Sequence, residues 1–275
     1  QKHAPPRLCA NATYRRTLCL IVEYFQLEFS NMETNKILTF IKAIDNLFFN
    51  SFINDGQVCM NTIKWFRNYE SQNANIGDKF EGVEMACGKG FTIKVADPIE
   101  SFSSEADLKN KMNSANWTEL GSGINFRFYH DDNNANIFSL SVIYSDIAND
   151  NSGNYLVSKK YMDEFSDHKF VIFLQPDEFI SKMNQAISRL GKSMKLGIVQ
   201  YYSLDERFQR NLSYFHKPDT YSYQNEFRIV FEDPNAVQQI FSLGSLKDLC
   251  LEIDIKKKYK IELIDNNQFS IKSID

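Results

Sequence analysis

The sequence predicts an α+β fold in which an antiparallel sheet, split or folded into a sandwich, is flanked by helices. Three observations predict this class: many short strand-like segments, few long helical ones, and no regular alternation between the two. Hydrophobic residues make up 43% of the 275 residues and charged residues 24%, as in a globular protein with a sizeable core. No repeat, low-complexity block or linker divides residues 32–275, so we expect them to form a single domain.

The early part of this domain reads as helix, strand and helix. Apolar residues recur at helical spacing over residues 37–52 and stop before Gly56, which predicts a first helix with a buried face. A short strand is expected over 57–61, followed by a helix over 62–69 that is capped by its first residue.

The later part of the chain mixes one clear helix with several strands. Pro176 at a first helical position, acidic residues directly after it and Gly191 at the end predict an amphipathic helix. Strands are expected over 91–95, 124–129, 137–144, 169–174, 195–203, 222–231, 249–255, 260–264 and 269–271.

The first 31 residues differ from the rest, and we interpret them as an N-terminal extension outside the domain. Arg15 and Arg16 precede an apolar run over 18–25, which superficially resembles a secretory signal. However, Glu23 interrupts this run, and the run is too short to span a bilayer. We therefore expect no export and no membrane contact.

Charge and cysteine content argue against several function classes. A net charge of −4 gives no general attraction to nucleic acid or to an anionic membrane. The 5 cysteines form no CxxC pair and do not cluster with the 4 histidines, which argues against a zinc site and against a disulfide framework. We expect a cytoplasmic protein that needs no metal.

The segment Tyr223–Phe231 carries the strongest functional signal. Alternation along a strand places Gln224, Glu226 and Arg228 on one face, with aromatic and β-branched residues on the other. One interpretation is a half-exposed strand with a cross-strand Arg–Glu pair. The other is a site in which a carboxylate stabilises positive charge on a sugar.

Four short motifs extend this signal over most of the chain: Asp55–Thr62, Trp65–Arg67, Ile76–Gly82 and Gln224–Arg228. Together they resemble a widespread group of microbial proteins that is similar to the ADP-ribosyltransferase superfamily, which includes toxins of anti-phage toxin–antitoxin systems. The resemblance spans residues 32–255. It implies an ADP-ribosyltransferase-like split antiparallel β-sandwich, NAD as a substrate, a protein or RNA acceptor, and an antitoxin protein as a partner.

The resemblance also implies roles for individual residues. Glu226 is the expected catalytic carboxylate, and Gln224 is the group expected to orient the acceptor. Loss of neutral nicotinamide from NAD develops positive charge on the ribose, so one carboxylate suffices and no general acid is needed. The residues expected to contact NAD are Asn61, Arg67, Ser139, Ser141 and Tyr223.

Arg67 illustrates an open choice. Its guanidinium is expected to bind a phosphate of NAD while Trp65 and Phe66 stack on a ring. Alternatively, Arg67 pairs with Glu70 on a helix surface.

Other interpretations of the whole chain also remain open. Asp78, Glu81 and Glu84 are the kind of acidic cluster found in magnesium-dependent nucleases. A 14% aromatic content suits a non-catalytic interaction domain. Glu226→Gln would discriminate the two: it should abolish the activity of a transferase but leave the binding and the fold of an interaction domain intact. A basic lip for a polynucleotide acceptor would consist of Lys192, Lys195, Arg207, Arg210 and Lys217.

Overall fold

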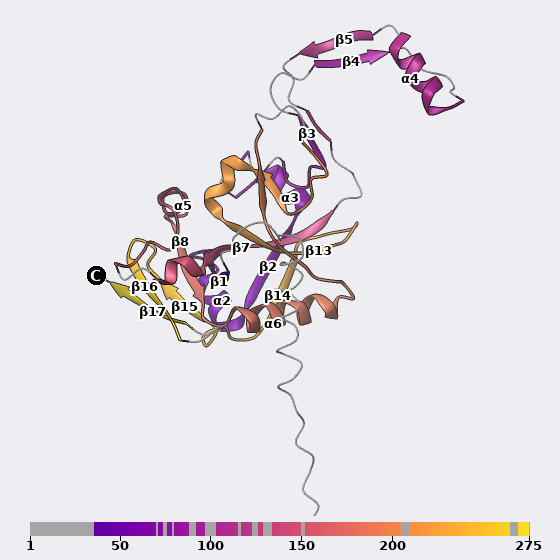
Figure 1. The fold of residues 1–275 in the computed structure, drawn as a ribbon. Helices are drawn as coiled ribbons and strands as arrows, with labels where there is room; N and C mark the ends of the chain where they lie inside the picture. Colours follow the sequence, from indigo (N-terminus) through magenta and orange to yellow (C-terminus); the bar gives the residue numbers. More distant parts are fainter. Residues whose placement is uncertain are drawn as a thin grey trace, which may run out of the picture.

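The computed structural model describes most of the chain after residue 35: residues 36–69, 71–73, 76–78, 80–87, 92–96, 103–114, 117–122, 126–128, 134–149, 152–204, 209–264 and 269–274. The expected N-terminal extension lies outside these residues. Within them the fold is α+β, with an eight-stranded sheet and several helices, which confirms the predicted class (Figure 1).

The eight-stranded sheet is antiparallel and is built around β7 (Ala135–Tyr144). Its main path has the order β14 (Gln239–Ser242), β2 (Gln57–Thr62), β7, β1 (Ile37–Asp45), β8 (His168–Phe173) and β15 (Cys250–Ile253). Off this path, β13 (Glu226–Glu232) pairs with β7, and β9 (Lys195–Ile198) pairs with β13. As a result, β7 and β13 lie in the interior of the sheet.

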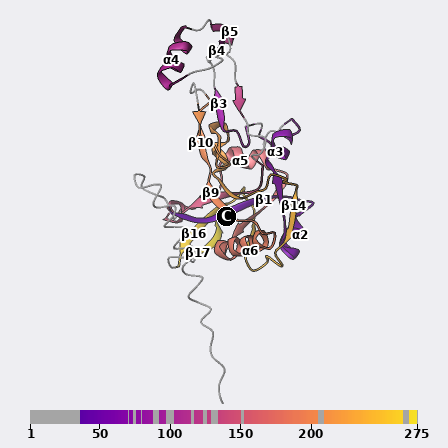
Figure 2. The ribbon, with the colours of Figure 1, turned by 90° about the vertical axis from the view of Figure 1, so that its right-hand side faces the viewer.

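The described α-helices are α2 (Phe49–Asp55), α3 (Ile63–Tyr69), α4 (Glu105–Ser114), α5 (Lys159–Glu164) and α6 (Pro176–Arg189), and the 3-10 helices are η1 (Ser145–Asn149) and η2 (Asp219–Gln224). Smaller sheets contain β3 (Met85–Cys87), β4 (Thr92–Ala96), β5 (Trp117–Ser122), β6 (Phe126–Phe128), β10 (Gln200–Tyr202), β11 (Gln209–Arg210), β12 (His216–Pro218), β16 (Lys258–Leu263) and β17 (Phe269–Ile274). In Figure 1, β4, β5 and α4 lie apart from the large sheet. Figure 2 shows α6 on one side of that sheet and α3 and α5 on the other.

One face of the large sheet is an apolar core covered by α6. This helix forms where the sequence predicts it, with Pro176 in its first turn and Gly191 just beyond its end at a φ of 69°. Phe179 and Met183 point from α6 into a cluster with residues such as Phe138 of β7. Burial of large apolar side chains on this face is the main stabilising contribution that the fold receives from α6.

The opposite face of the sheet holds two smaller apolar clusters. One contains Ile143 of β7 together with residues of β1, β8 and α5. The other contains Ile137 of β7 with Ile63 and Val230. Because side chains alternate along a strand, the residues of β7 on this face between Ile137 and Ile143 are Ser139 and Ser141. Polar groups therefore separate the two clusters.

The first predicted helix is wrong over most of its length. Residues 37–45 form strand β1, and only α2 (Phe49–Asp55) is helical. β1 lies between β7 and β8, and both of its faces contact apolar clusters, so its sequence is a nearly continuous apolar run. Such a run also satisfies helical spacing, which explains the error.

The strand predicted over 222–231 begins later than expected. Tyr223 and Gln224 belong to η2, Asn225 adopts the left-handed conformation with a φ of 43°, and β13 starts at Glu226. The half-exposed strand of the first interpretation is also wrong, because the first six residues of β13 are all buried. Glu226 and Arg228 are therefore buried charges on an interior strand.

Candidate active site

The site forms at a gap in the large sheet. β2 and β1 pair with different parts of β7: Asn61 lies opposite Ile137, and Ile41 lies opposite Ser141. Ser139 lies between these two pairings. The amide of Val142 donates to Asn225 at the start of β13, so strand alternation directs the amide and carbonyl of Ser139 away from β13 and into the gap.

Lys42 of β1 supplies a partner for this carbonyl. Its Nζ atom donates to the carbonyl oxygen of Ser139 over 2.9 Å and lies 4.7 Å from the centre of the Phe138 ring. Burial lowers the pKa of Lys42 to about 8, although the charge of Glu226 partly offsets this effect. The amine at the gap is therefore held by a carbonyl dipole and an aromatic face.

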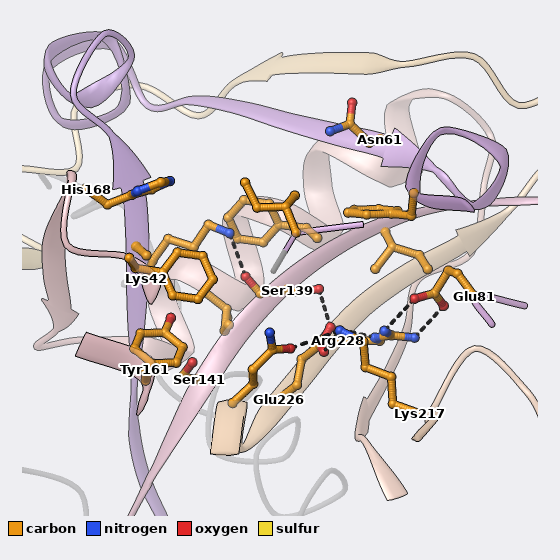
Figure 3. Close-up of a pocket in the computed structure, with 18 of the residues that line it drawn as sticks. Lys42, Asn61, Glu81, Ser139, Ser141, Tyr161, His168, Lys217, Glu226 and Arg228 are labelled. Carbon is orange, nitrogen blue, oxygen red and sulfur yellow. Dashed lines mark hydrogen bonds and ion pairs between the residues drawn. The ribbon is translucent and has the colours of Figure 1, made fainter. Parts of the chain in front are cut away.

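A cavity of about 190 Å³ opens at the gap (Figure 3). Its polar lining includes Lys42, Asn61, Glu81, Ser139, Ser141, His168, Lys217, Gln224, Glu226 and Arg228. Its aromatic lining consists of Phe66, Phe138, Tyr161 and Phe165. Figure 3 shows Ser139 and Arg228 beside Glu226, whereas Asn61 and His168 lie farther from it.

Both oxygens of the Glu226 carboxylate accept hydrogen bonds. Oε1 accepts from Nε of Arg228 over 2.7 Å and from the hydroxyl of Ser139 over 2.5 Å. Oε2 accepts from Nζ of Lys217 over 2.9 Å. The backbone amide of Glu226 donates to the hydroxyl of Tyr201 over 2.9 Å. The carboxylate is thus fixed from three sides.

Glu226 is ionised despite its burial. Its side chain is only 5% exposed, and burial alone would raise its pKa. The charges of Arg228 and Lys217, with the hydrogen bonds from Arg228 and Ser139, outweigh that effect and hold the pKa well below its usual range. The site therefore presents a permanent negative charge next to the hydroxyls of Ser139 and Ser141, which line the same cavity.

Arg228 connects Glu226 to a second buried carboxylate. Its Nη1 and Nη2 atoms each donate to Glu81 over 2.7 Å, and Nη1 also donates to the carbonyl of Tyr214. The nearby charges of Glu226 and Glu81 outweigh burial and raise the pKa of Arg228. All three groups are less than 5% exposed, so the network is shielded from solvent.

Asp78 lies at the far side of this network. Its Oδ1 accepts from the amide of Phe80 over 2.8 Å, whereas its buried Oδ2 has no hydrogen-bond partner among the described residues. Burial, together with the charge of Glu81, raises the pKa of Asp78 to about 7. The Asp78 carboxyl therefore exchanges its proton near neutral pH.

Lys217 joins the two residues that the sequence assigns to catalysis. Besides its bond to Glu226, Nζ of Lys217 donates to Oε1 of Gln224 over 2.9 Å and lies 4.7 Å from the centre of the Tyr221 ring. The amide nitrogen of Gln224 donates to the hydroxyl of Tyr223 over 3.2 Å. Gln224 is thereby oriented on both ends of its amide.

Five of the seven expected site residues line the one cavity, namely Asn61, Ser139, Ser141, Gln224 and Glu226. Arg67 and Tyr223 are not among its lining residues. Neighbouring residues on a helix point in different directions, and on α3 it is Phe66 that reaches the cavity. Glu70, the alternative partner of Arg67, lies outside the described residues.

Lys42 and Lys217 are the site residues that the sequence analysis missed. Lys42 had a signal, since a lysine in the middle of an apolar strand needs a specific partner. Lys217 entered only as part of the basic lip, and nothing in its local sequence indicates burial.

The structure does not favour the nuclease or the basic-lip interpretation, because several of the residues that they need are paired or buried. Both oxygens of Glu81 are bound by Arg228, and within the described ranges no group of three or more acidic, histidine or cysteine residues is arranged to hold a metal ion. Lys192 and Lys195 pair with carboxylates of Asp233 and Glu232, while Lys217 is buried. Arg207 lies outside the part of the chain that the structure describes.

Comparison with protein-family models, with curated proteins and with solved structures gives no match. Among the helices of the described residues, none has both the length and the apolar character needed to cross a bilayer. The function must therefore be argued from the site itself.

Proposed function

We propose that this protein is an NAD-dependent ADP-ribosyltransferase that modifies a protein or RNA acceptor. The observation that carries the proposal is the buried, ionised carboxylate of Glu226 at the wall of a cavity that also presents Ser139, Ser141 and Gln224. A fixed negative charge in a site of low dielectric is suited to stabilising positive charge that develops on a bound sugar.

The proposed reaction breaks the bond between nicotinamide and C1 of the ribose. The bonding electrons leave with nicotinamide, which departs neutral, and positive charge develops on the ribose ring. Glu226 stabilises that charge, and Gln224 orients the acceptor whose nucleophilic atom bonds to C1 and releases a proton. Ser139 fixes the orientation of the carboxylate through its 2.5 Å hydrogen bond.

The dimensions of the cavity suit one end of NAD. Its volume of about 190 Å³ is below the roughly 300–1,000 Å³ of pockets that enclose a whole cofactor-sized ligand. Aromatic side chains such as Phe66 and Phe138 offer apolar walls for a ring, and the Asn61 amide and the two serine hydroxyls offer hydrogen bonds to a ribose. Lys42 places an amine at the gap in the sheet. We assign to this amine the contact with a phosphate of NAD that the sequence analysis assigned to Arg67.

Two further features support the same proposal. The different pairing of β1 and β2 along β7 is consistent with an ADP-ribosyltransferase-like split sheet. A cytoplasmic toxin or anti-phage effector with an antitoxin partner is the setting that the sequence motifs imply, and we include it in the proposal.

The decisive variant must separate catalysis from folding. Glu226→Gln alone leaves the buried ammonium of Lys217 without its carboxylate, which destabilises a protein by about 3–5 kcal/mol when a buried pair is broken. Glu226→Gln alone therefore does not separate a loss of catalysis from a loss of stability. Glu226→Gln combined with Lys217→Met removes both charges, and Lys217→Met alone is its matched control.

The test measures NAD consumption and the transfer of labelled ADP-ribose to acceptors in a bacterial lysate. Wild type and Lys217→Met should consume NAD, and the double variant should be slower by on the order of a hundredfold or more. Gln224→Ala should retain slow NAD hydrolysis and lose transfer. A folded wild-type protein that neither consumes NAD nor labels an acceptor would contradict the proposal and favour the interaction-domain alternative.

A further inference from the structure

The protein supplies its own cation to the carboxylate that the proposed reaction needs. Nζ of Lys217 lies 2.9 Å from Oε2 of Glu226 and 2.9 Å from Oε1 of Gln224. The side chain of Lys217 is only 6% exposed. An ammonium therefore occupies the position between the two groups assigned to the sugar and to the acceptor.

This ammonium competes with the substrate for the same charge. The nicotinamide ring of NAD is cationic, and in the transition state part of that charge moves onto the ribose next to Glu226. Like charges repel strongly at a buried site, because the dielectric there is far below that of water. An ammonium fixed at Oε2 thus disfavours the substrate and, still more, the transition state.

Of the three donors to Glu226, Lys217 is attached to the least constrained element. Arg228 belongs to β13 and Ser139 belongs to β7. These two strands of the large sheet pair with each other along the whole length of β13, from Glu226 to Glu232. Lys217 belongs to β12, which pairs with β10 in a separate two-stranded sheet. The donor that can leave without disrupting the large sheet is therefore Lys217.

Two of the side-chain hydrogen bonds made by the segment that follows β12 are long. The hydroxyl of Tyr221 donates to Gly77 over 3.4 Å, and Nζ of Lys160 donates to Thr220 over 3.3 Å. Bonds of this length are weaker than those of about 2.9 Å that are typical of proteins. Nζ of Lys217 ends a flexible four-carbon side chain, so it can leave Oε2 by side-chain rotation while β12 stays paired with β10.

We propose that Lys217 is an internal cation: it binds the carboxylate of Glu226 in the resting protein and withdraws from it when a cationic substrate enters the cavity. The inference rests on the proposed function in that it takes Glu226 to be the carboxylate that stabilises the sugar. Lys217 is then a residue that selects ligands by charge. Arg228 and Ser139 remain on Oε1, so the carboxylate stays fixed and ionised after Lys217 leaves.

The experiment compares Lys217→Met, which removes the charge, with Lys217→Arg, which keeps it. Two probes are used: 1-methylnicotinamide, a cation methylated on the ring nitrogen, and nicotinamide, its neutral counterpart, each measured by titration calorimetry. Lys217→Met should bind the cation on the order of tenfold more tightly than wild type and the neutral probe equally well. Lys217→Arg should resemble wild type for both probes.

NAD hydrolysis provides the second readout. Lys217→Met should lower KM for NAD with a smaller change in kcat, and Lys217→Arg should restore the wild-type KM. Lys195→Met removes an exposed lysine of β9 in the large sheet and should change neither binding nor hydrolysis. Lys217→Gln removes the charge but keeps a hydrogen-bond donor, so it replaces Lys217→Met if that variant does not fold.

The outcomes separate this inference from the proposed function. Tighter binding of 1-methylnicotinamide by Lys217→Met, without NAD consumption by any variant, supports the internal cation and contradicts the transferase. Unchanged binding of the cation by both charge-removing variants overturns the internal cation, even if the wild-type protein consumes NAD.

Discussion

On β7 and β13, the two faces of the large sheet are buried to the same degree but carry opposite chemistry. Phe227 and Ile229 are 3% and 0% exposed on the face under α6, whereas Glu226 and Arg228 are 4% and 1% exposed on the other. The apolar face stabilises the fold through burial. A buried ion-pair network is often no more stabilising than apolar residues of the same size. Stability alone therefore does not account for the charged face, whereas the function that we propose for Glu226 would require it.

The largest expected effect breaks the charged face at its centre. Arg228→Met leaves Lys217 as the one cation among the described residues that is hydrogen-bonded to Glu226, and it removes the Arg228 donors from both oxygens of the buried Glu81. We expect the free energy of unfolding to fall by about 3–5 kcal/mol, the usual cost of removing one member of a buried ion pair. Urea unfolding followed by circular dichroism measures this change.

A neighbouring variant on the apolar face provides the comparison. Phe227→Leu keeps an apolar side chain against Phe40, whose ring centre lies 4.7 Å away, and should cost less than about 1.5 kcal/mol. Arg228→Met combined with Glu81→Gln removes one charge of each sign and should recover part of the loss. If Arg228→Met is no more destabilising than Phe227→Leu, the charged face is not an interdependent network.

The sequence predicted the apolar face better than the charged one. The helix from Pro176 and the strand at β7 were found because their patterns of apolar residues and end signals are local. β1 was mistaken for a helix because burial on both faces removes the alternation that identifies a strand. Tertiary context, which a local pattern does not contain, decides such cases.

For the site, the sequence provided the residues of β7 and β13 but not their partners. Ser139, Ser141 and Glu226 stand on strands with recognisable alternation, and the structure brings them to one cavity. Lys217 lies on a short strand outside the large sheet, and its role depends on a pairing with β10 that no local pattern specifies. Likewise, the contact of Lys42 with Ser139 depends on how β1 and β2 diverge along β7.

A smaller effect concerns the pH dependence of the charged face. The pKa of Asp78 is raised from 3.8 to about 7 in the folded protein, so between these values the folded state keeps a proton that the unfolded state has lost. Asp78 therefore favours folding at low pH, and this contribution is lost as the pH rises toward and through 7. Between pH 5 and pH 8 it should fall by about 2–3 kcal/mol.

Asp78→Asn should remove this contribution, so the stability of the variant relative to wild type should rise between pH 5 and pH 8. Subtracting the two profiles removes other titrating groups, including His216, whose pKa burial lowers. Asp107→Asn is the control: this partly exposed aspartate has its pKa lowered by hydrogen bonds from Ser103, so it is ionised in both states above pH 5. Parallel profiles for wild type and Asp78→Asn would rule out a buried proton at Asp78.

The smallest expected effect lies at the far end of β13, where the same strand carries an exposed ion pair. Nζ of Lys195 lies 2.5 Å from Oε1 of Glu232, and the two side chains are 50% and 46% exposed. Water solvates both charges there, so Lys195→Met should change the free energy of unfolding by less than about 1 kcal/mol. Added salt should weaken this contribution further and leave the effect of Arg228→Met nearly unchanged, because buried pairs are screened much less. Urea unfolding of both variants at low and high salt checks this contrast, and an equal salt response would mean that solvent reaches Arg228.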